Sequence, residues 1–264
     1  IGAASMEITA RFIANRLIKI FDNIIKILCY FFHFLFPKKR FILPKQSPPI
    51  YTTRENPVIP RILWQTNYTN RVTLPVYINY LFNRMLSPTY DYRFMVTEDR
   101  ADFIQSNYAK EIFEGYSKIQ IGAAQADLWR ILVLQKYGGV YLDIDAHFVW
   151  PLRMIVKKDF DELYLVRKRG GLSNYFIASR KNNPDLEKVI NAILKNIQEN
   201  KLTSVYRMTG PGVFNKIIDE SKVNALSYRY ICSQGNFTNE FFQYVDKPEG
   251  KWTKAQKVID IVKG

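Results

Sequence analysis

The chain has few of the residues that build disulfide frameworks and zinc sites. Its 264 residues include two cysteines, Cys29 and Cys232, and two histidines, His33 and His147. The cysteines show no zinc-ligand spacing, and two of them cannot form the framework of a small secreted domain. This shortage favours a reducing compartment. Because His147 follows a pair of aspartates, it could bind a metal or phosphate, although a surface position at the end of a strand is favoured.

The chain also lacks a hydrophobic run long enough to cross a bilayer. The longest charge-free apolar stretch is 27–36, which as a helix would measure about 15 Å against a hydrocarbon core of about 30 Å. Apolar residues nevertheless recur at helical spacing from Ile8 to Leu35, with basic and polar residues on the other face. We predict an amphipathic helix over 6–36 that lies on a membrane surface. A helix packed on its own domain, or one that binds a partner, is the alternative.

Acidic residues are outnumbered, with 24 Asp and Glu against 38 Lys and Arg and a net charge of +14. Such a charge attracts an anionic membrane surface, a nucleotide donor or a phosphorylated glycolipid. Lys38, Lys39 and Arg40 directly follow the predicted helix, where they would face anionic lipid. The other basic residues are spread along the chain and form no nucleic-acid-binding motif, so nucleic acid is not predicted as a partner.

Length and a hydrophobic fraction of 47% predict one main domain with a sizeable core. We interpret residues 1–5 as the remnant of a tag and 6–57 as the amphipathic helix followed by a proline-rich extended linker. Residues 58–264 form the predicted α/β domain. Within it we expect strands over 92–97 and 163–166 and helices over 184–198 and 213–218.

The most informative stretch begins with a short apolar helix. Asp127 and Arg130 are three residues apart, and therefore neighbours on one face of this helix. Gly138 and Gly139 follow Tyr137 and form a typical helix stop. The helix thus ends immediately before the next element and carries a carboxylate beside a guanidinium.

A short β-rich run from Val140 to Ile144 follows the two glycines. Alternation along a strand puts Tyr141, Asp143 and Asp145 on one face, opposite the face expected to be packed. Carboxylates that interrupt so apolar a strand are costly to bury unless they are paired or bound to a metal. Oxygen ligands of this kind suit Mg²⁺ or Mn²⁺, which typically bind one or two carboxylates together with substrate phosphates.

An Asp-x-Asp pattern alone is not specific, because the chain contains a second one. Asp159 and Asp161 lie in a charged segment with no preceding glycine pair and no apolar strand. We interpret that second pair as a solvated surface turn.

These residues together resemble the glycosyltransferases that contain a DXD sugar-binding region. That family includes yeast-type initiating α-1,6-mannosyltransferases, bacterial capsule and lipopolysaccharide sugar transferases and, more distantly, the glucosylating clostridial toxins. Further segments match the family in order: 59–66 its first strand, 174–179 with Asn183-Pro184 its middle, 209–212 its Thr-Gly-Pro turn, and 250–252 its terminal Gly-Ser-Trp. The resemblance implies a GT-A-type, Rossmann-like nucleotide-sugar-binding domain with a mixed central sheet.

The resemblance also implies roles for individual residues. Asp145 would ligate Mn²⁺ or Mg²⁺, Asp143 would reach the metal through water or contact the donor, and Asp127 and Arg130 would hold sugar hydroxyls. The family's histidine before the terminal motif is missing, and Asp246 or Glu249 stands in its place as a substitute group. The expected donor-binding residues are Trp64, Gln65, Thr66, Tyr141, Asn174, Gly210 and Trp252, of which Trp64 could equally be a core residue.

The predicted protein is a metal-dependent, retaining glycosyltransferase. It would transfer a hexose from a UDP- or GDP-sugar to a glycolipid or polysaccharide acceptor, as in lipopolysaccharide or capsule synthesis, on the cytoplasmic face of a membrane. Retention is implied by the resemblance alone, and no side chain is a convincing nucleophile. One alternative is a toxin-like effector that modifies a host protein. The other is a non-enzymatic basic protein that binds membranes or polyanions.

Overall fold

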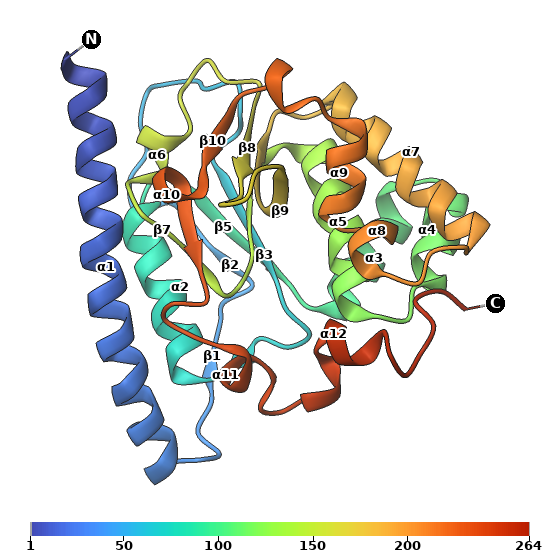
Figure 1. Ribbon diagram of the computed structural model, residues 1–264, viewed down its shortest axis with the longest axis horizontal. Coiled ribbons are helices and arrows are strands. Elements are labelled where there is room, and N and C mark those ends of the chain that lie inside the picture. The colour runs from blue at the N-terminus through green and yellow to red at the C-terminus, as the bar shows by residue number, and fades with distance from the viewer. Residues whose placement is uncertain (1, 264) are drawn as a thin grey trace.

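The structure, a computed structural model, describes residues 2–263, with side chains from Met6 onward. A long helix, α1 (Gly2–Leu35), lies along one side of an α/β body, as Figure 1 shows. Helix α2 (Leu74–Leu86) lies between α1 and the central sheet, and most other helices cover the opposite side. The predicted α/β class, with a mixed central sheet and a preceding N-terminal helix, is confirmed.

The central sheet has seven strands in the order β10-β8-β9-β6-β3-β5-β2. Strands β6, β3 and β5 run parallel to one another, and so do β10 and β8, whereas β9 and β2 are antiparallel to their neighbours. The carboxyl ends of β3, β5, β6 and β8 therefore meet at one edge, where open α/β sheets bind ligands. The bounds are β2 Gln46–Ser47, β3 Ile62–Thr66, β5 Asp91–Met95, β6 Gly139–Leu142, β8 Glu162–Val166, β9 Leu172–Ser179 and β10 Ala225–Ser227.

Both faces of the sheet are buried, because alternate side chains enter two separate cores. Tyr141 and Ile177 pack on the face covered by α5 (Gly122–Tyr137) and α7 (Pro184–Glu199). Val140 and Leu142 pack on the other face. The prediction that only the Val140 face is packed is wrong, because helices cover both sides of a parallel strand.

The remaining elements surround these layers. Two small antiparallel sheets pair β1 with β4 and β7 with β11. Their strands are β1 Phe41–Ile42, β4 Arg71–Val72, β7 Ala146–Phe148 and β11 Cys232–Gln234. The other helices are α3 Thr97–Asn107, α4 Lys110–Lys118, α6 Leu152–Ile155, α8 Val205–Met208, α9 Pro211–Ile217, α10 Tyr228–Ile231, α11 Glu240–Tyr244 and α12 Trp252–Ala255.

The proline-rich segment 37–57, expected to be an extended linker, is part of the folded body. It contributes β1 and the edge strand β2, and Leu43 between them is fully buried. The backbone stays extended because prolines disfavour helix, yet two short stretches retain free N–H groups that pair with neighbouring strands.

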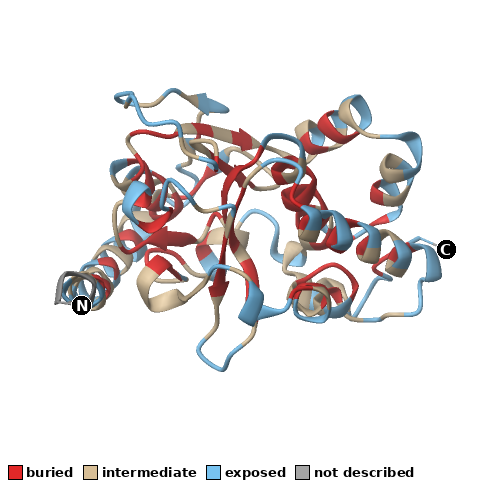
Figure 2. Cartoon of the chain, turned by 90° about the horizontal axis from the view of Figure 1, so that it is seen from above, coloured by how far each residue is buried: buried red, intermediate tan, exposed pale blue. Residues whose placement is uncertain are grey.

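Helix α1 packs on the body mainly through polar residues up to Asp22, and further along through Cys29 and a ring contact of Tyr30 with Phe242, while many of its apolar residues are exposed. Arg11, Asn15 and Asp22 are buried, whereas Ile20 and Ile27 are 63% and 69% exposed. Figure 2, in which α1 is seen nearly end-on, shows this helix at the margin of the molecule. Within the described residues, no helix is both long enough and apolar enough to cross a bilayer.

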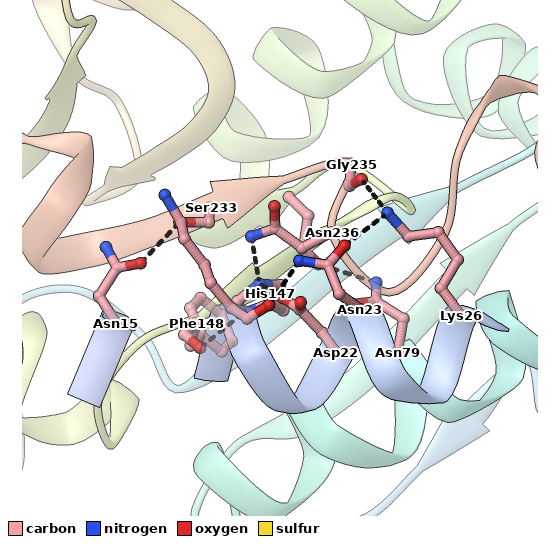
Figure 3. Close-up of polar contacts among 12 residues, drawn as sticks. Asn15, Asp22, Asn23, Lys26, Asn79, His147, Phe148, Ser233, Gly235 and Asn236 are labelled. Carbon is pink, nitrogen blue, oxygen red and sulfur yellow. Dashed lines mark hydrogen bonds and ion pairs between the residues drawn. The ribbon is translucent and has the colours of Figure 1, made fainter. Parts of the chain in front are cut away.

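The buried side of α1 is held by polar contacts, which Figure 3 shows in close-up. Asn15 donates to the carbonyl of Arg229 at 2.9 Å, and Lys26 donates to the carbonyl of Gly235 at 3.2 Å. Asp22 lies 3.5 Å from the Nε2 atom of His147, and both side chains are fully buried. His147 was expected at the surface; it is buried instead because α1 covers β7.

Candidate active site

The site is built on the junction between α5 and β6. Gly138 and Gly139 have φ angles of +69° and +109°, so a side chain at either position would be strained. A Cβ atom on Gly139 would also lie 2.7 Å from the carbonyl oxygen of Ile62 on β3. The glycine pair therefore lets the chain turn directly from α5 into the middle of the sheet.

The two motif aspartates lie in a turn after β6, not on the strand. Strand β6 ends at Leu142, and the amide of Ala146 donates to the carbonyl of Asp143 at 3.0 Å. Aspartate favours turns of this kind, which accounts for the earlier end of the strand. Asn79 on α2 fixes the turn by donating to the carbonyls of Ile144 and Ala146, each at 2.9 Å.

Arg130 lies between the carboxylates of Asp127 and Asp143. Its guanidinium is 3.1 Å from an oxygen of each and lies over the ring of Tyr141, 4.4 Å from the ring centroid. Burial lowers the pKa of Arg130. The neighbouring negative charges, Asp143 above all, raise it by more than burial lowers it, so the net shift is upward. Tyr141 donates to the same oxygen of Asp143 at 2.6 Å. The structure thus joins the helix motif and the turn motif in one network.

Asp127 is almost fully enclosed, and one ion pair and two hydrogen bonds satisfy it. Besides Arg130, its carboxylate accepts hydrogen bonds from Asn174 at 2.8 Å and from Thr209 at 3.0 Å. Burial raises the pKa of Asp127, and the charge of Arg130 and the bond from Thr209 oppose that rise. Segments from three distant parts of the sequence, all singled out by motif, therefore converge on this carboxylate.

The carboxylates of Asp143 and Asp145 converge on one point, where the amide nitrogen of Gln234 lies. This nitrogen donates to Asp145 at 2.9 Å and to Asp143 at 3.3 Å. Burial and the charge of Asp143 raise the pKa of Asp145 to about 7. Two facing carboxylates that share one neutral donor fit a divalent cation. Such a cation would offset the repulsion between the two carboxylates, which the single charge of Arg130 beside Asp143 only partly balances. Among residues 2–263, no group of three or more His, Cys, Asp and Glu side chains could hold a metal. Other ligands would therefore have to come from the donor phosphates and water.

These residues line a cleft of about 790 Å³ at the carboxyl edge of the sheet, a volume within the range of small-molecule sites. The structure brings to its wall most of the predicted set. These are Thr66, Asp127, Arg130, Tyr141, Asp143, Asp145, Asn174, Gly210, Glu249 and Trp252. The C-terminal segment from α11 to α12 also lines the cleft, through residues that include Glu240, Tyr244 and Trp252.

Three predicted residues are not on this wall. Trp64 is 4% exposed, donates to the carbonyl of Gly138 at 3.0 Å and stacks on Tyr137, so it belongs to the core. Gln65 is fully buried behind the turn and donates to the carbonyl of Asp143 at 3.2 Å, which makes it a positioning residue. Asp246 forms a two-pronged ion pair with Arg40, with both distances 2.6 Å, and does not line the cleft.

The cleft also contains functional candidates that the motifs do not mark. Arg100 on α3 lines the cleft, is 2% exposed and donates to Thr97 at 3.0 Å. No carboxylate lies within ion-pair distance of it in the described part of the chain. A buried cation of this kind favours an anionic ligand. Gln234 also lines the cleft, whereas Asn79 is fully buried and supports the turn from behind. Neither residue has a local sequence signal.

Comparison with known proteins places the chain among glycosyltransferases. Residues 75–161 match the family described as the glycosyltransferase sugar-binding region containing the DXD motif. An uncharacterised glycosyltransferase of Acanthamoeba polyphaga mimivirus is 26% identical over 181 residues, covering 63% of this chain and 67% of that protein. Inositol phosphoceramide mannosyltransferase 3 of Schizosaccharomyces pombe is 30% identical over 94 residues, which is 26% of its length. These matches confirm the predicted resemblance to the DXD-containing glycosyltransferases, with the family match itself lying over residues 75–161.

Solved structures of similar shape were also found. The PaToxG glycosyltransferase aligns with a TM-score of 0.49 and 20% identity over 78% of each chain. The UDP-bound glycosyltransferase domain of the YGT toxin aligns with a TM-score of 0.39 and 14% identity, covering 60% of this chain and 56% of that one.

Proposed function

We propose that the protein is a metal-dependent glycosyltransferase that transfers a hexose from a nucleotide diphosphate sugar to an acceptor at a membrane surface. The convergence of Asp143 and Asp145 on the nitrogen of Gln234 carries this proposal. It supplies a divalent-cation site beside a sugar-binding pair, Asp127 and Arg130, in a cleft large enough for a nucleotide sugar.

Each group in the cleft has a role that follows from its chemistry. Asp127 accepts hydrogen bonds from sugar hydroxyls, while Arg130 donates to hydroxyl or phosphate oxygens. Arg100 offers a buried positive charge to the diphosphate. Mn²⁺ or Mg²⁺ bound by Asp143 and Asp145 would neutralise charge on the departing diphosphate.

The transfer itself needs no enzyme nucleophile. The acceptor hydroxyl oxygen bonds to the anomeric carbon as the bond from that carbon to the diphosphate oxygen breaks, and the hydroxyl proton passes to the departing diphosphate. Asp127 is held by the Arg130 ion pair and two hydrogen bonds, which makes it a poor nucleophile. Because the departing diphosphate takes the proton of the attacking hydroxyl in this scheme, departure and attack occur on the same face of the sugar, and the configuration is retained.

The exposed apolar side of α1 supports a membrane location. Its outward residues include Leu17, Ile20, Ile24 and Ile27, each more than half exposed. A continuous apolar stripe beside Lys38, Lys39 and Arg40 fits an anionic lipid surface better than water. A second copy of the chain or a partner helix would be the alternative occupants of this stripe.

Donor binding to an Asp145→Asn variant tests the proposed function. Calorimetric titration with UDP- and GDP-hexoses, with and without Mn²⁺, should show metal-dependent binding to the natural chain and none to the variant. Asp159→Asn, in the second Asp-x-Asp pattern on the surface, is the matched control and should bind as the natural chain does. Metal-dependent binding that survives in Asp145→Asn would refute the assigned role.

The acceptor is tested separately with labelled donor. Incubation with a membrane fraction and a soluble lysate should place the label in lipid or polysaccharide. Label in a protein band would instead indicate the toxin-like alternative.

A further inference from the structure

A second cavity, of about 300 Å³, lies between α1, the turn after β8 and the strand β11. Its lining includes Lys19 from α1, Arg167 and Lys168 from the turn, and Tyr228 from α10. We refer to it as the basic cavity. No carboxylate is among its lining residues within the part of the chain that the structure describes.

The cations of the basic cavity are not neutralised by the protein. Across residues 2–263, none of Lys19, Arg167 and Lys168 forms an ion pair. The ammonium of Lys19 and the guanidinium of Arg229 each lie 5.9 Å from the ring centroid of Tyr228. A hydrogen bond from Arg229 lowers the pKa of Tyr228, and the charges of Lys19 and Lys168 lower it further. The cavity is thus a concave site of uncompensated positive charge, which attracts an anion.

The basic cavity adjoins the catalytic cleft. Arg167, Tyr175 and Gln234 line both. Gln234 also contacts Asp145 at 2.9 Å. A ligand in the basic cavity therefore lies next to the proposed metal site, where the bond between the sugar and the diphosphate would break. This is the place for an acceptor, because its hydroxyl must reach the anomeric carbon while the rest of the molecule stays outside the donor site.

The basic cavity and the apolar stripe share helix α1. Lys19 lines the cavity, while Ile20, the next residue, is 63% exposed and belongs to the stripe. A molecule with an anionic head and an apolar tail would meet both surfaces at once.

From these observations we infer that the basic cavity binds the phosphate of a phospholipid or phosphoglycolipid acceptor, presented by the membrane on which α1 lies. This inference rests on the proposed function and deepens it by assigning the acceptor's chemical class and its binding residues. Arg167 and Gln234, shared by the two cavities, would then border both substrates.

The test compares two double variants of equal charge. Lys19→Ala with Lys168→Ala removes two cations from the basic cavity, and Lys201→Ala with Lys257→Ala removes two exposed cations elsewhere. The probe is sn-glycerol 3-phosphate, titrated at fixed ionic strength by calorimetry. We expect the Kd of sn-glycerol 3-phosphate to rise at least tenfold in the Lys19→Ala/Lys168→Ala variant. In the Lys201→Ala/Lys257→Ala variant it should rise less than twofold. Equal losses in the two pairs, or no loss in either, would overturn the inference.

Vesicles identify the source of the phosphate. The natural chain should bind phosphatidylcholine vesicles that contain phosphatidylglycerol more tightly than phosphatidylcholine alone, and the Lys19/Lys168 pair should lose most of that difference. If sn-glycerol 3-phosphate binds but the vesicles show no such difference, the lipid source is wrong. Thermal melts of all variants report folding.

Titration of the natural chain with Mn²⁺ and donor separates the two proposals. Absence of donor binding refutes the proposed function. If the donor binds, but the Kd of sn-glycerol 3-phosphate is unchanged in the Lys19→Ala/Lys168→Ala variant, only the proposed acceptor site is refuted.

Discussion

The side-chain amide of Gln234 donates a hydrogen bond to the carboxylate of Asp145 at 2.9 Å. Gln234 comes from β11, which pairs with β7 so that Gln234 lies opposite Ala146, the residue after Asp145. This register, set by strand pairing, holds a neutral donor at the point where the motif carboxylates face each other. The contact lowers the pKa of Asp145 and partly offsets its burial.

Gln234→Leu should therefore make donor binding more sensitive to acid. Without the amide, Asp145 holds its proton more tightly, and the proton competes with Mn²⁺. At pH 6 we expect the affinity for Mn²⁺ and donor to fall about tenfold, the equivalent of roughly one pKa unit, and at pH 8.5 to change less than about twofold. Calorimetry at both pH values measures this. A loss of equal size at both values would show that Gln234 acts through structure alone.

Proton release on metal binding should reveal the raised pKa of Asp145. A carboxyl group with a pKa of about 7 is mostly protonated at pH 6 and must lose that proton to bind a cation. Affinity for Mn²⁺ and donor should fall by about tenfold per pH unit below pH 7 and level off above it. Titration in buffers of different ionisation enthalpy should detect about one released proton at pH 6 and almost none at pH 8.5.

The same shift affects stability in the metal-free protein. The folded state keeps a proton on Asp145 that the unfolded chain, with a usual pKa of 3.8, has already released. This contribution to the free energy of unfolding is therefore largest below pH 4 and is lost as the pH rises towards 7. Asp145→Asn should remove that slope. An unchanged slope in the variant would contradict the assignment.

Asp127→Ala should be strongly destabilising. Removing this carboxylate takes a buried partner from Arg130 and leaves the donors of Asn174 and Thr209 unpaired. Loss of one member of a buried pair costs about 3 kcal/mol or more, measurable by urea denaturation. Asp159→Ala, at an exposed position, should change the free energy of unfolding by no more than about 0.5 kcal/mol. Similar small effects in the two variants would mean that water replaces the lost contacts of Arg130.

Asp22→Asn should leave the protein as stable as before or stabilise it by about 1 kcal/mol. Within residues 2–263, neither carboxylate oxygen of Asp22 has a hydrogen-bond donor, and the Nε2 atom of His147 lies 3.5 Å from one of them. That histidine nitrogen already contacts the amide of Asn236 at 3.0 Å. An asparagine amide can donate where the carboxylate cannot, and it avoids a buried charge. A loss above about 2 kcal/mol in thermal or urea unfolding would indicate a stabilising ionised pair.

Charges placed on the outer side of α1 should abolish vesicle binding without unfolding the protein. Ile20→Asp with Ile27→Asp interrupts the apolar stripe at positions 63% and 69% exposed. Flotation with vesicles rich in anionic lipid should show at least about a tenfold loss of bound protein, since apolar burial supplies much of the binding. Ile50→Asp with Val258→Asp, at positions 70% and 83% exposed, is the control. Equal binding by the two pairs would refute the membrane-facing orientation.

Local patterns predicted much of the α/β domain. The helices over 184–198 and 213–218 are found as α7 and α9, within one or two residues at each end. The glycine stop at Gly138 and the pairing of Asp127 with Arg130 were also predictable, because helix spacing and backbone freedom are local properties. The family motifs marked the segments of Asp127, Asn174 and Thr209 but did not predict that these three side chains meet.

Contacts between distant segments could not be predicted in this way. Gln234 meets Asp145 through strand pairing, and no spacing in the sequence records that register. Periodicity divides α1 into two faces but does not say which one meets the body. Its polar side packs inward because His147, Ser233 and the carbonyls of Arg229 and Gly235 offer partners there.

The glycine junction has a consequence for the spacing of the two motifs. A Cβ atom on Gly138 would lie 2.8 Å from the amide nitrogen of Lys181, and one on Gly139 would lie 2.7 Å from the carbonyl oxygen of Ile62, so the backbone is enclosed on both sides there. The distance from the proposed sugar-binding pair on α5 to the proposed metal ligands after β6 is therefore set by the backbone itself, and any larger residue at the junction would shift the two groups relative to one another.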